Sequence, residues 1–110
     1  MPIEANEVGA DALAIKITRD LLDNADGTVG FEAYLREAMV RGKTRFEFRL
    51  HGLKYLNSTE IGAMLRAAVL VRGGGGRIAL LELNKKIHDV LIVAKVDTLF
   101  EIRSSSHADG

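Results

Sequence analysis

Hydrophobic residues alternate with polar ones along several short stretches of the chain. Residues 12–18, "ALAIKIT", and 44–50, "TRFEFRL", carry an apolar side chain at every second position. This period of two predicts strands, each with one face directed to a core. Residues 77–83, "RIALLEL", form a short, nearly continuous apolar run that is typical of a strand inside a sheet. Weaker patterns at 3–8 and 98–102 predict two further strands.

Three other stretches repeat their apolar residues at helical spacing. These are residues 29–41, 58–72 and a segment that follows Asn84 and extends to about residue 94. Charged side chains fill the opposite face of each stretch, as expected for helices that pack on a core. Asn84 is a favoured N-cap, and Gly42 is placed to end the first helix.

The segment between the second strand and the first helix contains several turn-forming residues. Residues 21–28, "LLDNADGT", include two aspartates, an asparagine and a glycine. This composition predicts a loop, with Thr28 as the N-cap of the helix that follows. The resulting order is β, β, α, β, α, β, α, β. It predicts an α/β fold with a mostly parallel sheet and right-handed crossovers, mixed because the first two strands form an antiparallel hairpin.

Composition narrows the classes of protein to consider. The chain has 110 residues, which suits one domain, with 15 basic and 15 acidic side chains. This balance provides no overall field that would attract nucleic acid or an anionic membrane. With no cysteine, disulfides and thiolate metal sites are excluded. The N-terminus lacks the features of a signal peptide, and no apolar run approaches the ~20 residues of a membrane span. We therefore expect a cytoplasmic protein without membrane insertion.

Several motifs that could carry chemistry have simpler explanations. The glycine run at 73–76 leaves a helix and enters a strand, whereas phosphate-binding loops run from a strand into a helix. His51, His88 and His107 share no metal-ligand spacing. A triad built on Ser58 and His51 lacks the usual nucleophile elbow. We expect no metal, no cofactor and no enzymatic activity.

The stretch "YLNSTEIGAML", residues 55–65, contains the strongest candidate site. Asn57 is a favoured N-cap, and Glu60 stands three residues on, where it completes a capping box. These two roles leave Ser58 and Thr59 in the first helical turn, where no hydroxyl is required. A hydroxyl there faces unpaired N–H groups and the positive end of the helix dipole. Phosphorylation would add roughly −1.5 to −2 charges at this point.

The same stretch, taken with its flanks, resembles the STAS domain family of anti-sigma factor antagonists. The most specific part is "LKYLNSTEIGAMLRAAVLVRGGGGRIALLEL", in which an apolar pair precedes two hydroxyl residues, a helix, a glycine-bearing turn and an apolar strand. The resemblance covers roughly residues 3–103. It implies a single STAS-like domain over residues 1–103, with four to five strands and helices mainly on one face. Residues 104–110 are expected to form a flexible polar tail.

The resemblance also implies a function. In the simplest members, a serine kinase that is also the anti-sigma factor phosphorylates the first hydroxyl residue, and phosphorylation releases the antagonist. Carried over, this assigns the phospho-acceptor to Ser58, with Thr59 as second candidate, and predicts a regulatory protein rather than an enzyme. The residues expected to contact the kinase partner are Tyr55, Asn57, Ser58, Thr59, Glu60, Gly62 and Arg66.

Two residues depart from the family pattern. Asn57 stands where the family has Asp, and Glu60 stands where it has Gly. Glutamate at this position adds bulk, and its charge is expected to repel a nearby phosphate. The alternative is therefore a STAS domain that binds constitutively, as a scaffold or a transporter-associated subunit without a phospho-switch. The sequence leaves the oligomeric state open.

Overall fold

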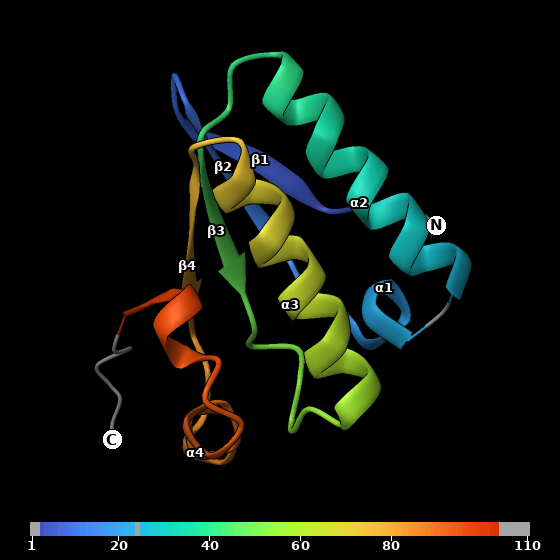
Figure 1. The fold of residues 1–110 in the computed structure, drawn as a ribbon, viewed down its shortest axis with the longest axis vertical. Coiled ribbons are helices and arrows are strands. Elements are labelled where there is room, and N and C mark those ends of the chain that lie inside the picture. Colours follow the sequence, from blue (N-terminus) through green and yellow to red (C-terminus); the bar gives the residue numbers. More distant parts are fainter. Residues whose placement is uncertain (1–2, 24, 104–110) are drawn as a thin grey trace.

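A computed structural model describes residues 3–23 and 25–103 of the chain. Five strands form one sheet in the order β1-β2-β3-β4-β5, with helices packed against it (Figure 1). The elements are β1 (Ala5–Gly9), β2 (Ala12–Lys16), α1 (Arg19–Asp23), α2 (Ala25–Val40), β3 (Arg45–Arg49), α3 (Ser58–Gly73), β4 (Arg77–Leu81), α4 (Lys85–Val93), the 3₁₀ turn η1 (Asp97–Leu99) and β5 (Glu101–Ile102).

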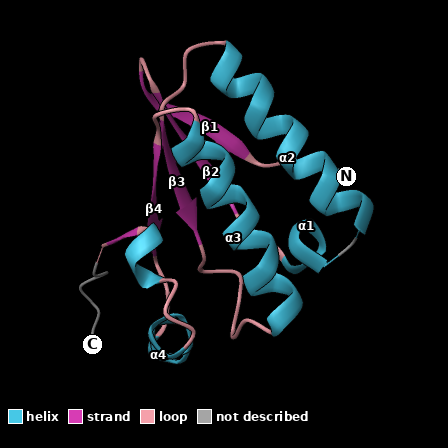
Figure 2. Cartoon of the chain, in the orientation of Figure 1, coloured by secondary structure: helices cyan, strands magenta, loops and turns pink. Residues whose placement is uncertain are grey.

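The pairing of the strands explains why the helices lie on one side. β1 is antiparallel to β2, and every later neighbour is parallel. Each parallel connection moves one strand further in the same direction, so right-handed crossovers place their helices on the same face. Figures 1 and 2 show α1, α2 and α3 on that side of the sheet. The α/β class, the mixed sheet and the helical layer on one face are confirmed.

The alternation in β3 sets the position of the core. Phe46 and Phe48 are buried beneath the helices, and the ring of Phe48 lies 5.5 Å from that of Phe31 in α2. In register with Phe48 stand Ile15 of β2 and Leu80 of β4, both fully buried. Side chains from all four α-helices join this cluster. Burying each large apolar side chain contributes about 1.5–3 kcal/mol, so the core supplies the main stabilising term.

Residues 21–23 and 25–28 are helical, so the predicted loop is wrong. α1 includes Leu21 and Leu22, which are buried in the core, and Thr18 Oγ1 accepts a hydrogen bond from the Leu21 N–H at 3.3 Å. Thr28 lies inside α2 rather than at its N-cap, because that helix begins at Ala25. Tertiary burial of the leucine pair overrides the turn-forming composition of this segment.

The remaining boundaries are close to those predicted. α2 ends at Val40, and Gly42 has a φ of +98°, a backbone conformation that favours glycine. β4 stops at Leu81, before Glu82 adopts a φ of +61°. The last strand is shorter than predicted, because η1 occupies 97–99. Residues 104–110, predicted to be a polar tail, lie outside the described residues. No helix among those described is long and apolar enough to cross a membrane.

Candidate functional site at the start of helix α3

The first turn of α3 is held by a complete capping box. Asn57 has an extended backbone, with φ −91° and ψ 177°, and its Oδ1 accepts the Glu60 N–H at 2.8 Å. In return, Glu60 Oε1 accepts the Asn57 N–H, also at 2.8 Å. The predicted cap is confirmed. It fixes the start of the helix and satisfies two of the backbone donors that a helix N-terminus leaves unpaired.

Glu60 lies inside the protein rather than on its surface. Its side chain is fully buried, and Oε2 accepts a hydrogen bond from Arg19 Nη1 at 2.7 Å. The guanidinium of Arg19 in turn lies 4.6 Å from the centre of the Tyr55 ring. Glu60 therefore presents no exposed surface for a partner, and its negative charge is matched by an adjacent cation.

We call Arg19, Tyr55 and Glu60 the clamp. It joins the first residue of α1 to the loop before α3 and to the first turn of α3. Breaking a buried ion pair by removing one partner costs roughly 3–5 kcal/mol, since it leaves a charge unmatched. This range is an upper bound here because the Arg19 side chain is 38% exposed. The clamp thus stabilises the backbone that presents the two hydroxyl residues.

Ser58 and Thr59 are exposed at the first two positions of α3. The capping box uses the backbone N–H groups of Asn57 and Glu60. The N–H groups of Ser58 and Thr59 are the remaining donors of the first turn. Together with the helix dipole, these donors make a favourable environment for an anion, worth roughly 0.3–1 kcal/mol at an exposed site. A modifying enzyme can reach both hydroxyls without unfolding the helix.

The other predicted contact residues lie at different depths. Tyr55 is 47% exposed, and Asn57 is exposed beside its cap. Gly62 is half-buried, and a Cβ added there would be in ordinary contact with Arg66 Nη1 at 3.6 Å, so steric space does not require glycine. Arg66 is exposed further along α3, and its Nε donates to Glu32 Oε2 of α2 at 3.2 Å. This bond ties the two helices together at the surface.

The histidines of the described segments make surface pairs. His51 Nδ1 lies 2.5 Å from Glu82 Oε1 and joins the ends of β3 and β4. His88 lies beside Asp89, whose pKa is lowered by a hydrogen bond from Lys85. No group of three histidine, aspartate or glutamate side chains among the described residues could hold a metal ion. His107 is outside the described residues.

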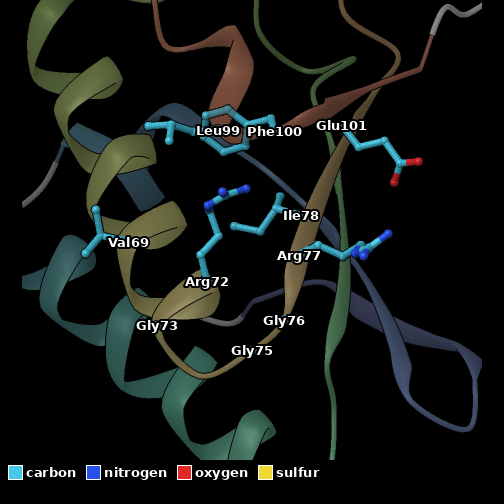
Figure 3. A pocket seen from close by; sticks show the side chains of 10 residues that line it. All are labelled: Val69, Arg72, Gly73, Gly75, Gly76, Arg77, Ile78, Leu99, Phe100 and Glu101. Atoms are coloured by element: carbon cyan, nitrogen blue, oxygen red, sulfur yellow. The ribbon is translucent and has the colours of Figure 1, made fainter.

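A hollow of about 750 Å³ lies between the end of α3, the start of β4 and η1 (Figure 3). It includes three residues of the glycine run, Gly73, Gly75 and Gly76. Gly76 allows a close approach of the backbone, since a Cβ there would lie 2.4 Å from the Thr44 carbonyl oxygen. The glycine run therefore lets the backbone pass close to Thr44 as the chain enters β4. The hollow lies at the opposite end of α3 from Ser58.

Comparison with solved structures identifies the fold. The solution structure of TM1081 from Thermotoga maritima is 18% identical, with a TM-score of 0.76 over 94% of this chain and 79% of that chain. The unphosphorylated Bacillus anti-sigma factor antagonist SpoIIAA is 14% identical, with a TM-score of 0.71 over 94% of this chain and 90% of that chain. The chain has the STAS fold. A STAS domain protein from Planctomyces limnophilus is 17% identical, with a TM-score of 0.70 over 94% of this chain and 91% of that chain.

Comparison of sequences alone does not detect this similarity. No family model matches the chain, and no curated protein does so either. The STAS fold is thus shared at low sequence identity. Sequence reasoning missed Arg19 and its contact with Glu60. The two residues are separated by 41 positions, and no local pattern links them.

Proposed function

We propose that this protein is an anti-sigma factor antagonist that binds a serine-kinase anti-sigma factor and is switched by phosphorylation of Ser58. The observation that carries the proposal is the exposed Ser58 hydroxyl at the first position of a capped helix, on a STAS fold. SpoIIAA, which has this fold, has been solved in both phosphorylated and unphosphorylated forms. The proposal places the protein in the cytoplasm, where sigma factors act.

The clamp answers the objection that Glu60 would repel a phosphate on Ser58. An unpaired Glu60 carboxylate would repel a phosphate on Ser58, but Arg19 Nη1 lies 2.7 Å from it and matches its charge. The dianion would therefore meet free N–H groups and the helix dipole rather than a bare negative charge. Its main effect falls on the partner, because it adds charge to a surface formed by Tyr55, Ser58 and Thr59.

The direct test is phosphorylation in vitro. The purified protein is incubated with ATP and each serine kinase of the anti-sigma class encoded in the same genome, and the product is analysed by mass spectrometry. We expect one phosphate on Ser58, and none on a Ser58→Ala variant. A Thr59→Ala variant is the matched control and keeps the modification. Absence of phosphate on both hydroxyls would refute the switch while leaving the fold unaffected.

The capping box and clamp also support a second candidate, a constitutive scaffold or transporter-associated subunit. They hold the loop before α3 in one conformation through four residues, which suits a surface that binds without regulation. On this hypothesis, Ser58→Ala and Ser58→Asp bind the partner with equal affinity. A tenfold difference, equivalent to about 1.4 kcal/mol, would exclude it.

A further inference from the structure

The face of the sheet opposite the helices is rich in cationic side chains. The residues of β3 that alternate with the buried phenylalanines are Arg45, Glu47 and Arg49. Their neighbours in register are alanines, charged residues and one leucine of β2 and β4, and the alanines do not belong to the hydrophobic core cluster. We call this the open face. Parallel strands normally have both faces covered. Among the described residues no helix packs on the open face, although its alanines, Ala12, Ala14 and Ala79, are themselves buried.

Like charges stand opposite one another on this face. Arg45 is in register with Arg77, and Lys16 is in register with Arg49. Cross-strand neighbours of like charge destabilise a sheet, by roughly 0.2–1 kcal/mol per pair. Among the described residues, none of these four cations has an ion pair with a carboxylate. The arrangement weakens the sheet and leaves these four positive charges without an ion pair in the described part of the chain.

Two carboxylates of the open face form their ion pairs with a fifth cation, Arg103, rather than with these four. Glu47 and Glu101 both pair with Arg103, at 3.2 and 3.5 Å. Arg77 and Glu101 line the hollow beside α3, and in Figure 3 their side chains point away from those of Val69 and Arg72. Glu4 lies at the margin, in a hollow that it shares with Lys16 and Arg49.

Arg49 also has an unsatisfied hydrogen-bond donor. Its Nε is buried and has no hydrogen-bond partner within the described part of the chain. An unsatisfied buried donor costs about 1–3 kcal/mol. A carboxylate that docks beside Arg49 could satisfy this donor after a small shift of the side chain.

We propose that the open face is a docking surface for an acidic segment of a partner protein. Charge complementarity favours this occupant, because a carboxylate-bearing chain would match the unpaired cations Lys16, Arg45, Arg49 and Arg77. The alternating carboxylates of Glu47 and Glu101 disfavour the continuous phosphate backbone of a nucleic acid. The face also offers no aromatic side chain on which bases could stack. The surface is separate from the start of α3, so it does not depend on the Ser58 switch.

The test is a titration of the isotope-labelled protein with a short poly-glutamate peptide, followed by backbone amide shifts in nuclear magnetic resonance spectra. We expect shifts confined to β2, β3 and β4, and their loss in high salt, where the screening length falls to about 3 Å at 1 M. An RNA oligonucleotide of equal charge is titrated in parallel. Absence of shifts with the peptide, or tighter binding of the RNA to this face, would overturn the proposal.

An Arg77→Glu variant distinguishes an effect on peptide binding from an effect on folding stability. It places a carboxylate opposite Arg45, so we expect the free energy of unfolding to rise while peptide affinity falls roughly three- to tenfold. A Lys86→Glu variant makes the same change in net charge at an exposed position of α4 and leaves the affinity within about twofold. Equal weakening by both variants would show a general charge effect and contradict a defined docking surface. An Arg45→Gln variant gives a second test of affinity without reversing a charge.

Discussion

Glu60 has one role that the sequence predicts and a second that only the structure reveals. Its spacing from Asn57 predicts the capping box, because both partners lie within one helical turn. The same spacing cannot show that the carboxylate is buried, or that it also binds Arg19. The second contact depends on how α1 packs against α3. Local hydrogen bonds were therefore predictable at this site, and the long-range ion pair was not.

Replacing Arg19 should lower the free energy of unfolding more than replacing Glu60 does. Arg19→Met leaves the fully buried Glu60 carboxylate without its cation, and we expect a loss of roughly 3 kcal/mol in the free energy of unfolding. Glu60→Gln keeps an oxygen for the Asn57 N–H and leaves the partly exposed Arg19 to water, with an expected loss of roughly 1–2 kcal/mol. Urea denaturation of both variants measures the order, and a larger loss for Glu60→Gln would contradict it.

At the scale of elements, the start of α3 is the part that the sequence predicts best. The apolar spacing, the N-cap and the glycine turn all indicate the same helix, and the structure gives it from Ser58 to Gly73. α1 was missed, because its five residues provide too little periodicity and its turn-forming neighbours predict a loop. Its two leucines are recognisable as helical only once the core that buries them is known.

The two asparagine caps allow a comparison between helices. Asn57→Ala and Asn84→Ala each remove a side-chain acceptor, from Glu60 N–H and Ile87 N–H respectively, at the same distance of 2.8 Å. We expect each to lower the free energy of unfolding by about 1 kcal/mol. Hydrogen exchange should accelerate in the first turn of the helix that loses its cap. Asn84 Nδ2 also donates to the Lys54 carbonyl at 2.9 Å, in the loop before α3, so Asn57→Ala should slow phosphorylation of Ser58 more than Asn84→Ala does. Equal slowing by the two variants would argue against a local effect.

For the whole molecule, one core on one face of the sheet carries the stability. Phe48→Ala should lower the free energy of unfolding by roughly 3–5 kcal/mol, because Phe48 is fully buried between the sheet and α2. Val40→Ala, at a side chain that is 87% exposed, should change it by less than about 0.5 kcal/mol. Chemical denaturation compares the two variants. Similar losses at both positions would contradict a single core beneath the helices.

The architecture leaves two surfaces of different character. The start of α3 presents exposed hydroxyl residues at a helix N-terminus, and the open face presents cations that form no ion pair within residues 3–23 and 25–103. The alternation in the strand sequences predicts that β3 has a polar face, but the cross-strand arginine pairs require the register of β3 with β4. The sequence therefore indicates the first surface directly and the second only through the fold.

The central claim is tested most directly by the affinity of the protein for the proposed kinase partner before and after stoichiometric phosphorylation. Isothermal titration calorimetry of both forms, with a non-hydrolysable nucleotide bound to the kinase, gives the two dissociation constants. We expect phosphorylation of Ser58 to weaken binding by at least tenfold, or about 1.4 kcal/mol, with Ser58→Ala binding like the unmodified protein. Equal dissociation constants for the two forms would contradict the proposed switch.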